Sequence, residues 1–238
     1  MNIRGFQRFT LVDFPGKMAC VVFVGECNFR CGYCHNPCLV FDPESQPLIS
    51  EDEIVSFLER RKGKLDGVVV SGGEPSLRNG LEEFMAKVKR HGFLVKLDTN
   101  GSNPERVIAA HRDGLIDALG IDYKAPSLKY NQIANCCTKD LSSKVRRLIK
   151  YAVENDIFID VRTTVHRTLL SMDDLAEMRT ELDSLGLKNW TLQQFNPVEV
   201  IDDKLLTSKT YSDTELVEIS SSLPNTRVRG LTGVFLDT

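Results

Sequence analysis

Short apolar runs alternate with amphipathic segments along most of this chain. We predict that six of these runs are strands: 18–24, 67–71, 93–97, 115–121, 157–165 and 190–195. The second run reads GVVVS, with no polar residue inside it. Such a run is typical of a parallel strand that is buried on both faces.

The segments between these runs have the periodicity of helices. The predicted helices are 51–62, 78–91, a short one starting at 103–104, 140–154, 171–185 and 212–223. Ser212 and Glu215 have the spacing of a capping box, in which the two residues satisfy each other's backbone amides. Gly92 and Gly186 follow two of the helices, where a left-handed residue commonly ends a helix.

Strict alternation of strands and helices predicts a parallel sheet with helices on its outer face. Right-handed crossovers would curl six such units into an incomplete barrel, so the expected fold is α/β, a partial (β/α)6 barrel. We expect one domain over 1–238, with a core at about 15–197 and an extension at 198–238. Within that extension, the tail 227–236 is expected to pair or pack at an edge.

Composition and charge narrow the class of protein. The formal net charge of −3 gives no electrostatic reason to expect nucleic-acid binding. No apolar run reaches the roughly 20 residues of a membrane-spanning helix, and residues 1–16 lack the apolar region of a secretion signal. We therefore expect a cytoplasmic protein with no membrane association. In that reducing compartment the seven cysteines indicate metal or redox chemistry rather than disulfides.

Three of these cysteines are close together near the N-terminus. Cys27, Cys31 and Cys34 lie in the run CNFRCGYC, with three and two residues between them. A closed structural zinc site uses four protein ligands, whereas a [4Fe–4S] cluster held by three leaves one iron open. The spacing therefore favours an open cluster. The alternative is a zinc site with Cys38 or His35 as fourth ligand.

Polar residues and glycines follow the predicted strands. These positions are Gly72 and Gly73 in SGGEP, Asp98 and Thr99 in DTNG, Asp122 and Lys124 in GIDYK, Arg162 inside the fifth strand, and Asn196 in QQFNP. In barrels of this kind the chemistry lies at the carboxyl ends of the strands. The paired glycines allow a ligand to approach the backbone, the aspartates can bind a hydroxyl, an ammonium or a cation, and the two basic residues can bind a carboxylate.

These motifs together resemble the radical S-adenosylmethionine enzymes over nearly the whole chain. The opening GFQRFTLVDFPGKMACVVFVGECNFRCGYCHNP, followed by DTNG, DYKAP, RTTVHRTLLS and LQQFNP, is most similar to the glycyl-radical-enzyme activating proteins. The subgroup it resembles most is the activase of anaerobic ribonucleoside-triphosphate reductase, and the pyruvate formate-lyase activating enzyme is a close relative.

The resemblance implies a role for each of these residues. Cys27, Cys31 and Cys34 would bind a [4Fe–4S] cluster, and the fourth iron would bind S-adenosylmethionine (SAM). The residues implied to contact SAM are Tyr33 and His35 at the adenine, Gly72 and Gly73 at the amino group, Asp98, Thr99 and Asp122 near the methionyl carboxylate, and Lys124 and Arg162 at the carboxylate or ribose. Relatives can hold a monovalent cation near that carboxylate. Asn196 departs from the His or Arg of the relatives.

The implied activity is reductive cleavage of SAM to a 5′-deoxyadenosyl radical that abstracts hydrogen from a glycine of a partner enzyme. The implied partners are an anaerobic ribonucleotide reductase as the glycyl radical enzyme and a flavodoxin or ferredoxin as electron donor. Two other functions remain open at this point. One is a radical SAM enzyme acting on a small molecule or peptide, and the other is a non-catalytic zinc or iron–sulfur binding module.

Overall fold

The strands of this chain lie side by side in the order in which they occur in the sequence. The computed structural model describes residues 1–232, and its eight strands form one sheet in the order β1 to β8. The strands are β1 (Ile3–Thr10), β2 (Ala19–Val24), β3 (Gly67–Gly72), β4 (Leu94–Thr99), β5 (Ala118–Asp122), β6 (Phe158–Val165), β7 (Trp190–Gln194) and β8 (Thr226–Arg229). Every neighbouring pair is parallel except β1 and β2, which are antiparallel.

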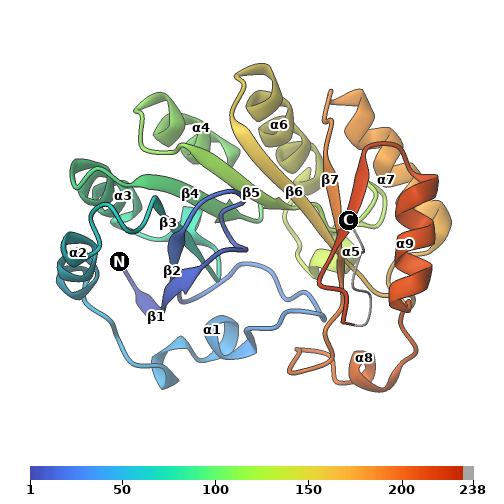
Figure 1. The fold of residues 1–238 in the computed structure, drawn as a ribbon. Coiled ribbons are helices and arrows are strands. Elements are labelled where there is room, and N and C mark those ends of the chain that lie inside the picture. Colours follow the sequence, from blue (N-terminus) through green and yellow to red (C-terminus); the bar gives the residue numbers. More distant parts are fainter. Residues whose placement is uncertain (233–238) are drawn as a thin grey trace.

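Helices cover the outer face of this sheet, and the sheet curves around its inner face (Figure 1). The helices are α1 (Pro37–Phe41), α2 (Glu51–Arg60), α3 (Leu81–Arg90), α4 (Pro104–Arg112), α5 (Tyr130–Ala134), α6 (Leu141–Glu154), α7 (Met172–Ser184), α8 (Lys204–Thr207) and α9 (Asp213–Ser222). Short 3₁₀ turns occupy Pro43–Ser45 and Pro75–Leu77. The predicted partial α/β barrel is confirmed, with β2 to β7 as its six predicted strands.

Local sequence explains the helix ends. The predicted capping box of Ser212 and Glu215 is present at the start of α9, and a second box joins Ser171 and Asp174 at the start of α7. Helix α3 begins three residues later than predicted because Gly80 adopts a left-handed backbone conformation (φ 78°) immediately before it.

Strands β2 to β5 are mostly buried on both faces, which explains their continuous apolar runs. On the outer face, Val22, Val68 and Val70 belong to the large core beneath the helices. On the inner face, Val21 and Val69 pack in a smaller cluster that also contains Phe14, Ala19 and Ala118. The small cluster fills one end of the barrel interior, and the remaining inner face is polar.

Two strands outside the predicted core extend the sheet. The sequence pattern did not predict β1, because its burial is partial and irregular and its central residues are exposed. β8 pairs in parallel with β7, so part of the tail forms an edge as expected. The rest of that predicted tail, 233–236, lies outside the described residues. The sheet does not close, since no pairing joins β1 and β8 within residues 1–232.

No helix among residues 1–232 combines the length and the apolar character that a membrane span requires.

The only tryptophan of the chain, Trp190, lies in the core at β6 and β7, so its fluorescence can be used to follow unfolding there. Trp190 is fully buried, and its Nε1 donates a hydrogen bond of 2.9 Å to Thr163 Oγ1, which in turn donates to the backbone oxygen of Tyr123. Thr163→Val would leave the indole N–H without an acceptor. We expect a loss of about 1–3 kcal/mol of unfolding free energy, measured by urea denaturation followed by tryptophan fluorescence.

The matched control is Thr180→Val. Thr180 is exposed on α7 and its hydroxyl donates only to the carbonyl of Ala176. We expect a change within about 0.5 kcal/mol there. Equal losses in the two variants would contradict the importance of the Trp190–Thr163 bond.

Candidate functional site

The three clustered cysteines lie on one irregular loop between β2 and α1. The backbone N–H of Cys34 donates to the carbonyl of Cys31 at 3.0 Å, which tightens the loop into a turn. The Arg30 side chain donates to the carbonyl of Cys27 at 2.6 Å, and the backbone N–H of Arg30 donates to the carbonyl of Ala134, the last residue of α5. The loop is therefore shaped by its own hydrogen bonds and attached to α5 at Arg30.

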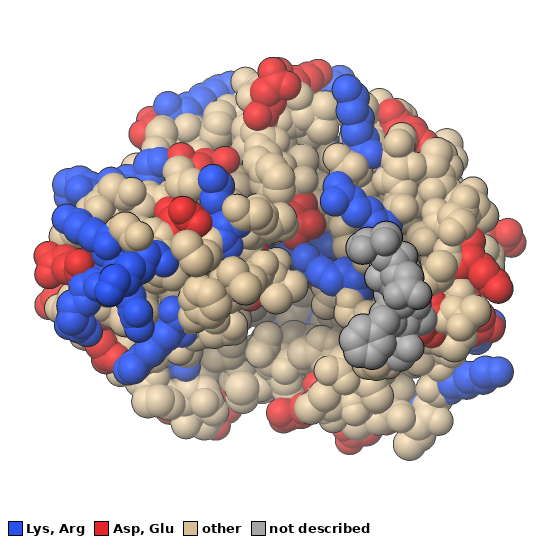
Figure 2. All heavy atoms as spheres, in the orientation of Figure 1, with Lys and Arg blue, Asp and Glu red and all other residues tan. Residues whose placement is uncertain are grey.

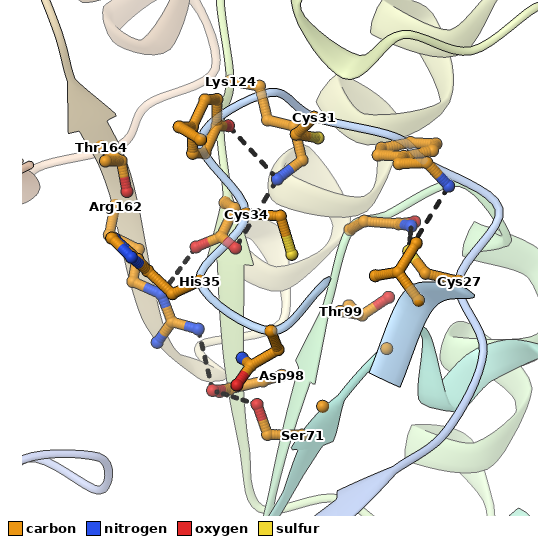
Figure 3. Close-up of a pocket in the computed structure, with 18 of the residues that line it drawn as sticks. Cys27, Cys31, Cys34, His35, Ser71, Asp98, Thr99, Lys124, Arg162 and Thr164 are labelled. Atoms are coloured by element: carbon orange, nitrogen blue, oxygen red, sulfur yellow. Dashed lines mark hydrogen bonds and ion pairs between the residues drawn. The ribbon is translucent and has the colours of Figure 1, made fainter. Parts of the chain in front are cut away.

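This loop borders a cavity of about 280 Å³ at the inner face of the sheet. The predicted site residues that line the cavity are Cys27, Cys31, Tyr33, Cys34, His35, Gly72, Gly73, Asp98, Thr99, Asp122, Lys124 and Arg162. Figure 2 shows this face hollowed in its middle, with basic and acidic side chains visible inside. Residues from the ends of β3, β4 and β5 thus meet the cysteine loop around one space (Figure 3).

Asn196 is the predicted site residue that does not line this cavity. It is exposed, two residues beyond the end of β7, and it lines a second cavity of about 490 Å³ with Phe195 and Pro197. Asp13, Gln193 and Arg229 line both cavities. The two cavities are therefore neighbours, and the second runs along the open side of the barrel between the β1–β2 connection and β8.

Burial and a nearby positive charge have opposite effects on the pKa of the three thiols. Burial raises the pKa of Cys27, Cys31 and Cys34, while the positive charge of Lys124 lowers it. Lys124 itself is buried, with Nζ 3.4 Å from the hydroxyl oxygen of Tyr33. Thiols bind metals as thiolates, so a metal centre in this cavity would replace their protons.

The proposed metal ligands that line the cavity are three thiols and one imidazole. Within residues 1–232, no three His, Cys, Asp or Glu side chains converge closely enough to hold one metal ion. Cys38, the proposed fourth zinc ligand, lies on α1 and is absent from the cavity lining, whereas His35 does line it. Cys136 and Cys137 also lie outside that lining.

The two glycines after β3 are required by the packing of the chain itself. Gly72 has a left-handed φ of 113°, and a side chain there would come within 2.5 Å of the backbone of Val24. A side chain at Gly73 would overlap the carbonyl of Glu26. These glycines thus seat the β3 loop directly against the start of the cysteine loop, in addition to lining the cavity.

Glu74 joins three loops of the site. Its fully buried carboxylate accepts hydrogen bonds from the backbone N–H of Asn100 at 2.6 Å, the hydroxyl of Thr99 at 2.7 Å and the backbone N–H of Ser76 at 3.0 Å. Burial raises the pKa of Glu74, and these donors oppose the rise. The side chain of Asn100 in turn donates to Asn28 on the cysteine loop at 2.9 Å. These hydrogen bonds, which we call the Glu74 clamp, connect the loops after β3 and β4 to the cysteine loop.

Arg162 connects the carboxylates of three strands. Its Nε donates to Asp122 at 2.7 Å, its Nη2 donates to Asp98 at 2.8 Å, and its Nη1 lies 3.5 Å from Asp160. Burial of Asp98 and Asp122 opposes their ionisation. The charge and hydrogen bonds of Arg162, together with the charge of Lys96 at Asp98 and of Lys124 at Asp122, outweigh this effect, so the pKa of both carboxyls falls. Both aspartates are therefore charged at neutral pH.

Three charged residues on the inner face were missed by the sequence analysis. Lys96 on β4 is fully buried and pairs with Asp98. Asp160 on β6 lies 3.4 Å from Arg229, the last residue of β8. Lys96 and Asp98 are two residues apart on one strand and so share a face, which is the one signal in the sequence that could have revealed the pair.

Tyr33 and His35 of the cysteine loop have different neighbours at the cavity. Tyr33 is buried beside Lys124, which lies over its ring at 5.5 Å from the centroid. His35 packs against Phe195 with ring centroids 5.8 Å apart, and burial lowers its pKa. His35 is therefore a neutral aromatic surface at neutral pH.

The sequence of this chain is similar to a known protein family and to several named proteins. The sequence model of the Radical SAM superfamily matches residues 21–183. A protein of Methanocaldococcus jannaschii, provisionally named as a glycyl-radical enzyme activating enzyme, is 28% identical over 98% of this chain and 98% of its own. The pyruvate formate-lyase-activating enzyme of Staphylococcus aureus is 35% identical over 48% of each chain.

Solved structures show the same fold. SuiB of Streptococcus suis, bound to its precursor peptide SuiA, has a TM-score of 0.66 at 13% identity, over 88% of this chain and 48% of SuiB. QueE from Escherichia coli has a TM-score of 0.52 at 13% identity, over 95% of this chain and 92% of QueE. This chain thus spans about half the length of SuiB and most of QueE.

The chain belongs to the radical SAM superfamily, because the family model covers more than half of it. Enzymes of this superfamily use a [4Fe–4S] cluster and SAM, so this protein is an iron–sulfur enzyme that uses SAM. The non-catalytic zinc module is therefore no longer a candidate.

The clamp at Glu74 gives a first prediction for the site. Glu74→Ala would leave three buried donors without acceptors, so we expect a loss of roughly 3 kcal/mol or more of unfolding free energy. The iron bound per chain after reconstitution should fall as well, because the β4 loop would lose its tie to the cysteine loop. Urea denaturation and iron analysis measure the two effects.

Glu83→Ala on α3 is the control, since Glu83 is exposed on that helix. It should leave stability within about 0.5 kcal/mol and iron content unchanged. A Glu74→Ala protein with normal stability and normal iron content would show that the clamp does not organise the site.

Proposed function

We propose that this radical SAM enzyme generates a glycyl radical on a partner enzyme, and that the partner is an anaerobic ribonucleotide reductase. We propose further that Cys27, Cys31 and Cys34 hold the [4Fe–4S] cluster and that the surrounding cavity holds SAM. A flavodoxin or ferredoxin would supply the electron.

The full-length match to an activase is the observation that carries this proposal. The relative from Methanocaldococcus jannaschii and this chain align over 98% of both lengths, and its provisional name is glycyl-radical enzyme activating enzyme. A second relative from the same organism carries the same provisional name and is 29% identical over 83% of this chain. By contrast, SuiB, solved with its precursor peptide, is about twice the length that this chain matches.

Different residues of the cavity would bind different groups of SAM. The backbone at Gly72 and Gly73 would meet its amino group, close to the open iron. Lys124 is the best placed cation for its carboxylate, because Nζ makes only long contacts, 3.4 Å to Tyr33 and 3.7 Å to Asp122. Arg162 already donates to two aspartates, so its role is to position them, and Thr99 lies beside them at the end of β4.

The adenine end of SAM would lie against the aromatic residues of the cysteine loop. His35, partly exposed, and Tyr33, buried, offer a face and an edge for a planar ring. Asn196 lies beyond them in the second cavity, and we propose that it contacts the partner's segment or the distal end of SAM.

A reduced [4Fe–4S] cluster held by Cys27, Cys31 and Cys34 would supply the electron for cleavage of SAM to methionine and a 5′-deoxyadenosyl radical, and this radical would take a hydrogen atom from the target glycine. The chain's part is to hold the two reactants in contact and to exclude water. We propose that the partner's glycine-bearing segment reaches the first cavity through the second. The residues common to both, Asp13, Gln193 and Arg229, would line that path.

One relative points to an alternative substrate class. The GTP 3′,8-cyclase of Helicobacter pylori, named for a nucleotide substrate, is 27% identical over 64% of this chain and 48% of its own. A small-molecule substrate is therefore the second candidate function.

The proposed activity can be tested directly. Reconstituted enzyme, SAM, a chemical reductant and anaerobic ribonucleotide reductase are mixed without oxygen, and electron paramagnetic resonance is recorded. We expect a radical on the reductase whose hyperfine splitting changes when the partner carries [2-¹³C]glycine, together with a matching amount of 5′-deoxyadenosine.

Pyruvate formate-lyase in place of the reductase is the control. A radical on the lyase alone would support the activase function, but it would show that the partner is pyruvate formate-lyase and not the reductase. Formation of 5′-deoxyadenosine with no radical on either protein would favour the small-molecule alternative.

A pair of cysteine variants tests the three-ligand site. Cys31→Ala should abolish the cluster and all 5′-deoxyadenosine formation, because a buried ligand is removed. Cys38→Ala on α1 should retain at least half of both, measured by iron and sulfide analysis and by product chromatography. An equal loss in the two variants would mean that Cys38 is a ligand and that the cluster is not held by three cysteines alone.

A further inference from the structure

Two aspartates face each other at the ends of neighbouring strands of the cavity. Asp98 on β4 is buried, and Asp122 at the end of β5 is partly exposed. Like charges this close disfavour each other's ionisation, and buried carboxylates are stable only when they are paired. A site built this way needs a positive charge that touches both carboxylates.

The chain itself supplies positive charge to every oxygen of the two carboxylates. Asp98 Oδ1 accepts from Lys96 Nζ, and Asp98 Oδ2 accepts from Arg162 Nη2 at 2.8 Å. Asp122 Oδ1 accepts from Arg162 Nε at 2.7 Å, and its Oδ2 lies 3.7 Å from Lys124 Nζ. Figure 3 shows Arg162 reaching Asp98 from the neighbouring part of the sheet.

A glycine makes this arrangement possible. Gly120 on β5 lies opposite Asp98 in the strand register and opposite Asp160 on its other side. A side chain at Gly120 would overlap Asp98 Oδ1 and would come within 2.7 Å of Lys96 Nζ. Because position 120 carries no side chain, residues of β4 and β6 meet across β5.

We propose that Lys96 and Arg162 together are a built-in counter-cation for Asp98 and Asp122, so that this site works without a bound monovalent metal ion. The ammonium of Lys96 occupies the place of the cation at Asp98, and the guanidinium of Arg162 bridges the two carboxylates. Lys96 is then a positioning residue: it fixes the charge and orientation of Asp98 and does not touch the reacting atoms. The inference deepens the proposed function and rests on it for the link to SAM.

The experiment compares salts of different cations at one ionic strength. Reconstituted wild-type enzyme and Lys96→Met are assayed in tetramethylammonium, sodium or potassium chloride, with 5′-deoxyadenosine formation and the thermal unfolding midpoint as two separate readouts. Wild-type values should agree within twofold in rate and within about one degree in midpoint in all three salts. In Lys96→Met, removal of the ammonium opens a place for a small cation beside Asp98.

For Lys96→Met we expect a rate at least tenfold below wild type in tetramethylammonium. Potassium or sodium should restore most of that rate and raise the unfolding midpoint. Lys89→Met is the matched control, because Lys89 pairs with Asp117 on the outside of the barrel and lies far from the cavity lining. It should show no dependence on the cation.

Two results would overturn the proposal. One is a wild-type enzyme that loses its rate or its unfolding midpoint in tetramethylammonium, and the other is a folded Lys96→Met that no cation restores. If Lys96→Met does not fold, the proposal is tested by the wild-type enzyme alone, through its rate and its unfolding midpoint in the three salts. If wild type forms no 5′-deoxyadenosine in any salt, the proposed function fails, and the unfolding midpoints still test the counter-cation.

Discussion

The ionic pairing of Arg162 inside the barrel is the constraint on which the rest of the site depends. A charged side chain taken out of water costs several kcal/mol unless a partner of opposite charge and good geometry meets it. Arg162 meets Asp98, Asp122 and Asp160, from three adjacent strands. The pairing is possible only in one register of β4, β5 and β6, so the charges and the strand alignment fix each other.

Around this ionic centre, two kinds of contact position the loops. Close backbone packing at Gly72 and Gly73 seats the β3 loop on the cysteine loop, and the buried carboxylate of Glu74 ties both to the loop after β4. The cysteines are thereby placed by neighbours that are not themselves ligands. This division resembles metal sites in which residues behind the ligands hold them in orientation.

The sequence predicted the parts of the molecule whose signal is local. The six parallel strands are apolar on both faces, and the cysteine spacing and strand-end motifs are short, so each was visible without its neighbours. β1 was missed because its central residues are exposed, and α1, α5 and α8 because none exceeds five residues. Lys96 was missed because its buried pairing with Asp98 depends on the space left by Gly120, which only the strand register places opposite Asp98. Asn196 was assigned to the same cavity as Arg162, and it lies in the neighbouring one.

The open side of the barrel has a mechanical consequence. A closed barrel resists widening, since every strand is hydrogen-bonded on both sides and any expansion breaks a ladder. Here β1 and β8 are not paired with each other within residues 1–232, so the gap between them can widen by a small decrease in sheet curvature while all seven ladders stay intact. Such a change breaks no hydrogen bond between strands. Room for a bulky polypeptide at the centre of the barrel would therefore require no local unfolding of the sheet.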